Sequence, residues 1–176
     1  MSTSSFKDKP IQLKLRRVVM LTCGVVLVLT CTAYFTYELI SFRQAAKTQV
    51  SMVGQIIASN STAALAFDNS DDAKEILSSL KGQKNIVSAC LYDKRGNIFS
   101  IYPDSVSRKR FPPAPSYIGY HFSGADLEGF QPVIQGDDQL GTLYIKSDMS
   151  ATYKRLALYV VIGLFFAALS FIIAFW

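Results

Sequence analysis

The sequence predicts an α+β domain that lies between two transmembrane helices. Two apolar runs contain no charged residue and cover 18–37 and 156–176. At about 1.5 Å per residue, a helix of either length can cross the roughly 30 Å hydrocarbon core of a bilayer. Between them, helical periodicity gives way to short strand-like runs that are separated by turn residues. An order of two helices followed by about five antiparallel strands is typical of an α+β domain.

Hydropathy and length divide the chain into four parts. The mean hydropathy of +0.24 is high for a soluble protein, and the apolar excess lies in the two runs. The first run is longer than the apolar core of a typical signal peptide, which favours an uncleaved anchor. We therefore expect a basic N-terminus (1–17), a first membrane helix (18–40), an outer domain (41–153) and a second membrane helix (154–176).

The distribution of charge predicts the orientation of the chain in the membrane. The net charge is +5, but residues 1–17 carry five basic side chains and one acidic one, whereas residues 41–153 carry 11 of each. Basic residues that flank a membrane helix favour the cytoplasmic side, so residues 41–153 are expected outside. No basic stripe of the kind that binds nucleic acid is visible, and we expect no nucleic-acid partner.

A long amphipathic helix is predicted for 42–67, directly after the first membrane helix. Apolar residues and one asparagine recur there with alternating spacings of four and three, which is typical of a parallel coiled coil and predicts a homodimer. An asparagine on such a seam can set its register. A second apolar line runs beside the seam at Phe42, Ala45, Met52, Ile56 and Ala63, and one broad stripe that faces the helix's own domain is the alternative. The predicted dimer seam consists of Ala46, Val50, Val53, Ile57, Asn60 and Ala64.

A short capped helix is predicted after a break at 67–70. Asn69 or Ser70 can cap its N-terminus, because their side-chain oxygens accept hydrogen bonds from free backbone N–H groups. Asp71 and Asp72 then complement the positive end of the helix dipole. Gly82 provides the stop signal.

The rest of the outer domain reads as a small antiparallel sheet. Gly96 can form the turn of a first hairpin. Pro132 cannot donate a backbone hydrogen bond, so its strand is expected at an edge of the sheet or to contain a bulge. A Pro-rich exposed loop is expected at 103–117. The expected strands cover 85–93, 98–102, 120–122, 127–134 and 139–148.

The last strand and the second membrane helix are nearly continuous. A helix is expected from Ser150, and a joint of about five residues, 149–153, connects it to the strand that ends at Asp148. Movement of the sheet would therefore shift the membrane helix. Met149, Ser150 and Tyr153 are the predicted transmission joint.

The sequence offers few groups for catalysis. His121 is the only histidine, which leaves no parts for a histidine-based metal site or a Ser-His-Asp triad. No glycine-rich phosphate loop follows a strand. Cys23 and Cys31 lie in the first apolar run, so Cys90 has no partner for a disulfide in the outer domain. We expect neither an enzyme nor a cofactor.

Two groups of residues are candidates for contacts with a ligand or a partner. Five aromatic residues could line a small pocket, although core packing explains them equally well: Tyr92, Tyr102, Tyr117, Tyr120 and Phe122. His121 could bind a ligand or sense pH, although a surface histidine at a strand end explains it too. A dense basic run could bind anionic lipid headgroups or an acidic partner, although a solvated loop explains it too. The candidates are Tyr92, Tyr102, Tyr120, His121, Arg108, Lys109 and Arg110.

Three segments carry a resemblance to a known family. They read ASNSTAALAFDNSDDAKEILSSL (58–80), NIVSACLYDKRGNIFSIY (85–102) and QLGTLYIKSDMSATYKRL (139–156). Together they resemble the CHASE-type (eighth class) periplasmic sensor region of bacterial hybrid histidine kinases and membrane diguanylate cyclases. The resemblance implies a PAS-like fold whose flanking membrane helices lead into a HAMP linker and an output domain.

On this resemblance the chain is expected to be the sensory input module of a receptor in the bacterial inner membrane. Its expected partners are membrane lipid, a second copy, and an unknown periplasmic ligand or small periplasmic protein. We expect the kinase or cyclase output region to be missing, because the sequence ends within the second apolar run. A membrane-anchored accessory or structural subunit that senses nothing is the alternative.

Overall fold

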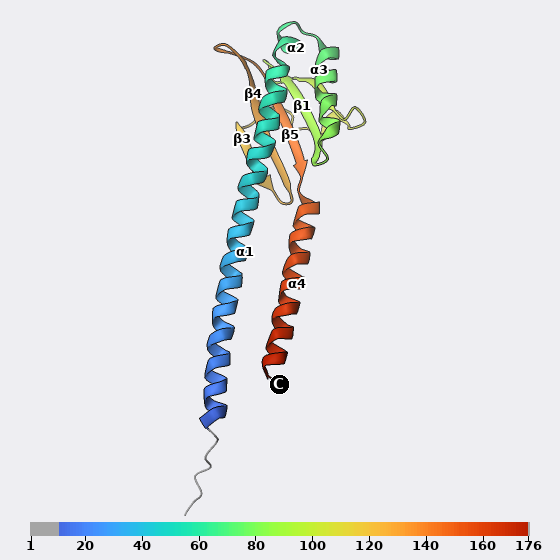
Figure 1. Cartoon of the computed structure of the whole chain (residues 1–176). Coiled ribbons are helices and arrows are strands. Elements are labelled where there is room, and N and C mark those ends of the chain that lie inside the picture. The colour runs from blue at the N-terminus through green and yellow to red at the C-terminus, as the bar shows by residue number, and fades with distance from the viewer. Residues whose placement is uncertain (1–10, 176) are drawn as a thin grey trace, which may run out of the picture. The chain divides into compact units, whose positions relative to one another are not determined.

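The computed structural model describes residues 11–175 (Figure 1). These residues form two compact units: one holds the ends of the chain, up to Arg43 and from Ile162, and the other holds Gln44–Val161. The second unit contains the helices and the sheet of the outer domain. We call it the sensor unit.

Two helices are long and apolar enough to cross a membrane. Helix α1 covers Ile11–Asn60 and helix α4 covers Ser150–Phe175. Their candidate membrane spans are Val18–Asn60 and Ser150–Leu169. Each contains an 18-residue window, of mean hydropathy 2.2 and 1.5 respectively, of which no part is buried inside the protein. Both predicted membrane helices are thus present as candidate spans.

The helix predicted for 42–67 is interrupted at Ser61. Helix α1 ends at Asn60 and a short helix, α2, follows at Thr62–Ala66. The fully buried Ser61 hydroxyl donates a hydrogen bond of 2.8 Å to the carbonyl oxygen of Ile57. A hydroxyl that bonds back to the preceding turn commonly bends a helix, which gives a physical reason for the break.

Helix α3 begins where the sequence indicates. It covers Ser70–Ser78 and continues into a 3₁₀ turn, η1, at Ser79–Gly82. The Asn69 side chain accepts hydrogen bonds from the backbone N–H groups of Asp71 and Asp72, which confirms it as the cap. Ala73 and Leu77 are fully buried, as the apolar spacing of this helix predicts.

Five antiparallel strands form one sheet in the order β2-β1-β5-β4-β3. The predicted α+β class and PAS-like arrangement of a long helix, a short helix and a five-stranded sheet are confirmed. A register shift next to Pro132, between Val133 and Ile134, agrees with the expected bulge. The strands are β1 (Ile86–Asp93), β2 (Ile98–Tyr102), β3 (Gly119–Ser123), β4 (Asp126–Gln135) and β5 (Asp138–Asp148).

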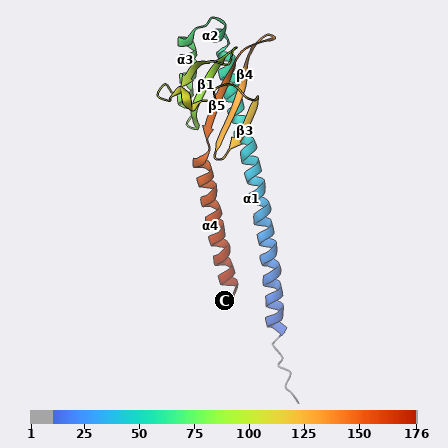
Figure 2. The same ribbon diagram turned by 180° about the vertical axis from the view of Figure 1, so that it is seen from behind.

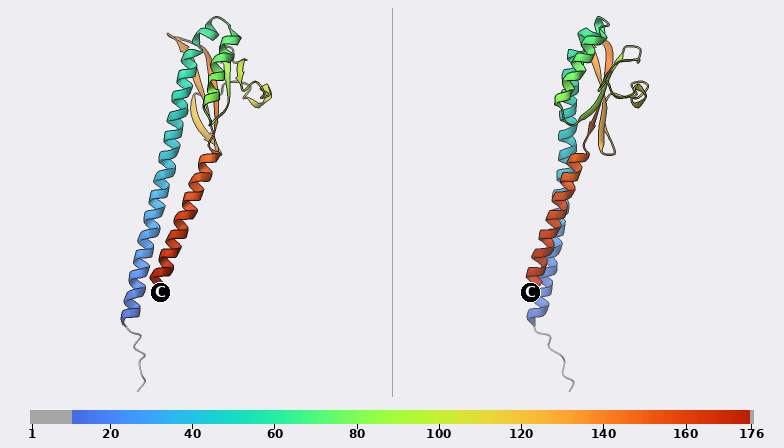
Figure 3. Two further views of the ribbon diagram at one scale, coloured as in Figure 1. Left: turned by 45° about the vertical axis from the view of Figure 1, so that its right-hand side comes forward. Right: turned by 90° about the vertical axis from the view of Figure 1, so that its right-hand side faces the viewer.

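The two faces of the sheet have different covers. Helices α1 and α3 lie over one face of the sheet, which we call the helix face. The views from behind and from the side show that neither helix covers the other face (Figures 2 and 3). Gly54 of α1 lies against Ile145 of β5, and α3 lies against β2. Residues 103–118 cross the opposite face, which we call the loop face, and place Phe111 in a cluster with Cys90, Tyr92, Phe130 and Tyr144.

Candidate functional site

The loop at 103–118 is fastened to the sheet by aromatic side chains. Phe111 is 6% exposed and meets the Tyr144 ring edge-on, with 6.2 Å between ring centroids. Tyr117 meets Phe130 edge-on at 4.9 Å. The Tyr92 hydroxyl donates a hydrogen bond of 2.6 Å to the carbonyl oxygen of Pro112. The loop therefore cannot move far without disturbing β1, β4 and β5.

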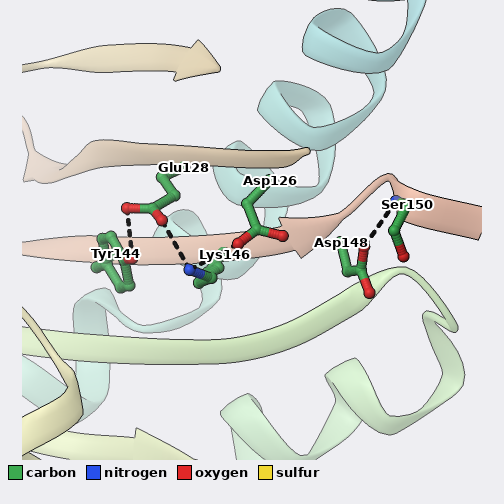
Figure 4. A network of polar contacts seen from close by, with 6 residues as sticks. All are labelled: Asp126, Glu128, Tyr144, Lys146, Asp148 and Ser150. Atoms are coloured by element: carbon green, nitrogen blue, oxygen red, sulfur yellow. Dashed lines mark hydrogen bonds and ion pairs between the residues drawn. The ribbon is translucent and has the colours of Figure 1, made fainter. Parts of the chain in front are cut away.

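A polar network continues from this aromatic cluster along β4 and β5 (Figure 4). The Glu128 carboxylate accepts hydrogen bonds from the Tyr144 hydroxyl at 3.0 Å and from the Lys146 Nζ at 2.8 Å. Lys146 also forms an ion pair of 2.8 Å with Asp126. Glu128 is the direct cross-strand partner of Lys146, so the network fastens two neighbouring strands.

The environment of the network keeps Glu128 and Lys146 ionised at neutral pH. Burial alone would raise the pKa of Glu128, but hydrogen bonds from Lys146 and Tyr144 outweigh it and hold the pKa below its ordinary value. Hydrogen bonds to Asp126 and Glu128 raise the pKa of Lys146. These shifts oppose proton transfer near pH 7 and suit a structural clamp.

The network ends beside the joint to the second membrane helix. Strand β5 ends at Asp148 and α4 begins at Ser150, so Met149 alone separates them. The Met149 N–H donates to the Ala125 carbonyl at 3.0 Å, and the Asp148 N–H donates to the Asn85 carbonyl at 2.8 Å. Met149 is 3% exposed. The end of β5 is thus tied to the start of β1 and to the β3–β4 turn.

The first turn of α4 is capped by the last residue of the strand. The Asp148 carboxylate accepts a hydrogen bond of 2.6 Å from the Ser150 N–H, and hydrogen bonding to Ser150 lowers the pKa of Asp148. The predicted start at Ser150 is correct, but the predicted joint of about five residues is too long. Tyr153 lies inside α4, and its N–H bonds to the Met149 carbonyl at 3.0 Å.

The residues predicted to line one ligand pocket lie on two faces of the sheet. Cross-strand pairs place Tyr102 and Tyr120 on the helix face, in one row with Ala89, Ile145 and Gly129. The same pairings place Tyr92 and His121 on the loop face. These residues therefore do not share one face of the sheet, because alternate residues of a strand point to opposite sides.

On the loop face, His121 and the basic run stay accessible. His121 is exposed and its ring lies 4.5 Å from that of Tyr117. Arg108, Lys109 and Arg110 form an exposed 3₁₀ turn, η2, and make no ion pair with any carboxylate of residues 11–175. These four side chains remain candidates for contact with a ligand or a partner.

Most of the predicted dimer seam is buried within its own chain. Ala46, Val50, Ile57 and Ala64 are at most 6% exposed, whereas Val53 is half-buried and Asn60 is exposed. This line of α1 and α2 faces its own domain, as the single-stripe alternative predicts. The second apolar line is exposed to solvent instead, at Ala45, Met52, Ile56 and Ala63.

The Glu128–Lys146 network is not predicted from the sequence. Its signal is weak: Asp126 and Glu128, like Tyr144 and Lys146, are two residues apart and so share a face of a strand. Only the register of β4 against β5 brings the two pairs together. Among the described residues, no group of three or more His, Cys, Asp or Glu side chains is placed to hold a metal ion.

Comparison with known families agrees with this geometry. The model of a family described as CHASE8, a periplasmic sensor domain, matches residues 42–146, which is more than half of the chain. The chain belongs to the CHASE8 family. No curated protein matches it. The CHASE8 match starts within α1 and ends at Lys146, so it includes the loop and the polar network and stops just before the joint.

Proposed function

We propose that this CHASE8 chain is the sensory input module of a receptor in the bacterial inner membrane. It detects a periplasmic ligand or protein and passes the signal through its membrane helices to a cytoplasmic output such as a histidine kinase or a diguanylate cyclase. The observation that carries the proposal is the one-residue connection between β5 and α4. A strand that continues directly into a candidate membrane span can report its own displacement across the bilayer.

The proposed signal begins on the loop face. A ligand or partner that binds the exposed side chains of His121 or of the basic turn η2 displaces the 103–118 loop. Phe111 and Tyr144 pass that displacement to β5 through their ring contact. Binding can drive the change only if the ligand has different affinities for the two arrangements, and coupling of about 1–3 kcal/mol is typical.

A reporter fusion tests the proposal. We would join the whole chain through a HAMP linker to a cytoplasmic diguanylate cyclase domain and measure cyclic di-GMP in cells. The sensory model expects Lys146→Met, which breaks the clamp on the loop face, to change the output without changing the amount of protein in the membrane. Lys74→Met, which removes an exposed ion pair with Asp104, is the matched control. Equal outputs from wild type and Lys146→Met would favour the accessory-subunit alternative.

The proposed topology places Met1 in the cytoplasm and residues 41–153 in the periplasm. Single cysteines at Ser4 and Ser107, in a background without the native cysteines, would be labelled in intact cells with an impermeant thiol reagent. We expect labelling at position 107 only. Labelling at position 4 alone would show that the orientation is the reverse, and residues 41–153 could then not detect a periplasmic ligand.

We also propose that two copies pack in parallel along the exposed apolar line of α1 and α2. Both copies enter the membrane with the same orientation, so their α1 helices run in the same direction. Met52 is 55% exposed and Ile56 is 59% exposed, and their spacing of four continues to Ala63 seven residues later. Cysteines at 52, 56 and 63 should form disulfides between copies more readily than cysteines at Thr48 or Gln55. Stronger crosslinking at Val50 and Ile57 would show that the dimer forms along the seam predicted from the sequence instead.

A further inference from the structure

One buried polar atom of the sensor unit has no partner. The side chain of Tyr120, on β3, is turned to the helix face and only 7% of the residue is exposed. Its hydroxyl makes no hydrogen bond with any of the described residues. Buried hydroxyl groups are nearly always paired, because an unpaired one loses its bonds to water and gains nothing in return. The position of Tyr120 therefore carries a free-energy cost.

The unpaired hydroxyl lies directly against α1. A Cβ atom built on Gly54 would overlap the Tyr120 hydroxyl oxygen and would lie 3.3 Å from the Tyr120 Cζ and from the Ile145 Cδ1. Because glycine has no Cβ atom, α1 can approach the Tyr120 hydroxyl this closely at Gly54. Burial raises the pKa of Tyr120 to about 12, so the hydroxyl keeps its proton and needs an acceptor.

The two other buried tyrosines show what Tyr120 lacks. Tyr92 donates its hydroxyl proton to the Pro112 carbonyl, and Tyr144 donates to Glu128. Both lie on the loop face, where their hydroxyls fasten the loop and the network. On the helix face the corresponding hydroxyl is pressed against a helix whose neighbouring buried side chains, Val50 and Ala58, are apolar.

We infer that α1 has a second position on the sheet, in which the Tyr120 hydroxyl is hydrogen-bonded, and that the Gly54–Tyr120 contact acts as a latch between the two positions. In the docked position the helix packs closely and the hydroxyl is unpaired. In the displaced position the hydroxyl gains water or a backbone carbonyl, and part of the close packing is lost. Each position thus has one favourable contribution that the other lacks, and in this proposal the two are balanced closely enough for a modest stimulus to exchange them. The latch does not depend on the joint at Met149.

Distance measurements on the whole chain test the latch. Spin labels would be attached at Gln55 of α1 and Ser123 of β3, both exposed, in a cysteine-free background in nanodiscs, and distances measured by double electron–electron resonance. We expect two distances in the wild type and a several-fold smaller displaced fraction in Tyr120→Phe. The control, Tyr92→Phe, removes a paired hydroxyl and should leave the displaced fraction unchanged. A single distance shared by the wild type and Tyr120→Phe would overturn the inference.

A second pair of variants tests the contact itself. Gly54→Ala favours helix formation by itself, so a larger displaced fraction and a lower melting temperature must come from overlap with Tyr120. Adding Tyr120→Phe removes the overlapping oxygen and leaves the tight 3.3 Å approach to Cζ. The double variant should therefore recover most of the docked fraction. Equal effects of Gly54→Ala with tyrosine and with phenylalanine at 120 would overturn the assigned contact.

Discussion

Helices α1 and α4 are attached to the same sheet in opposite ways. Helix α4 continues β5 after one residue, and the backbone N–H groups of Asp148 and Met149 bond to Asn85 and Ala125. Helix α1 is held on the helix face by packing, at a contact where Gly54 meets an unpaired hydroxyl. Moving α1 along the sheet breaks apolar contacts that can form again elsewhere, whereas moving α4 requires moving β5.

This difference suggests a division of labour within the proposed receptor. A packed element with two positions of similar free energy can set the state of the domain, and a covalent continuation of the sheet can transmit it. The experiments that follow either loosen the attachment of α4 or change the stability of the domain while leaving that attachment intact.

Loosening the joint should have the largest effect. Four glycines inserted after Met149 break the bonds that Asp148 and Met149 accept from the first turn of α4. The bonds that their N–H groups donate to Asn85 and Ala125 lie N-terminal to the insertion, so the domain should fold and keep its melting temperature. In the reporter fusion, Lys146→Met should then no longer change the output. The same insertion at Gly136, in the β4–β5 turn, is the control and should preserve that response. A response that survives the insertion at Met149 would make α1 the main route of transmission.

Breaking the polar network should have the next largest effect. Lys146→Met leaves Glu128 and Asp126 facing each other without a cation, and because the site is about one third exposed we expect a loss of only about 1–2 kcal/mol at pH 7. The free energy of unfolding would be measured with urea. Lys74→Met, at an exposed ion pair, should show no measurable loss.

The same substitution should change the dependence of stability on pH. The pKa of Glu128 is lowered in the folded protein, so its stabilising contribution is present above the pKa of the unfolded state and disappears as the pH falls through the folded value. The gap between wild type and Lys146→Met should therefore narrow between pH 7 and pH 4. A gap that stays constant over this range would argue against ionised Glu128 as the partner of Lys146.

Ser147→Ala should have a smaller effect at the end of β5. The Ser147 side chain is fully buried and its hydroxyl donates a hydrogen bond of 3.0 Å to the Asn85 carbonyl, which also accepts from Asp148. Because one of these two bonds remains, we expect a loss of about 1 kcal/mol in the free energy of unfolding. Ser123→Ala, at an exposed strand end, should be neutral. A neutral Ser147→Ala would mean that the Asp148 bond alone holds this corner.

Local patterns in the sequence predict the elements of this fold well. Apolar run length identifies the two candidate membrane helices, Asn69 marks the start of α3, and Gly96 takes the positive φ that its hairpin turn requires. These signals act within a few residues of the chain, so no tertiary contact is needed to read them.

The candidate site depends on features that the sequence does not display. Glu128 and Lys146 are 18 residues apart, and only the register of β4 against β5 pairs them. Tyr92 and Tyr120 are separated by the same rule, because a shift of one residue moves a side chain to the other face of a sheet. For α1, periodicity finds two apolar lines but cannot tell which of them meets the sheet.

The smallest expected effect is a gain of stability at the turn between α2 and α3. Asp68 has a φ of +53°, a left-handed conformation that strains a residue with a side chain and suits glycine. Asp68→Gly removes that strain but adds flexibility to the unfolded chain, so we expect a net gain of only about 0.5 kcal/mol in urea unfolding. Asp68→Ala keeps the strain and should not stabilise. If Tyr120 and Gly54 set the position of α1, Asp68→Gly should leave both the spin-label distances and the reporter output unchanged. A change in either would indicate that this turn, and not the Gly54–Tyr120 latch, sets the position of α1.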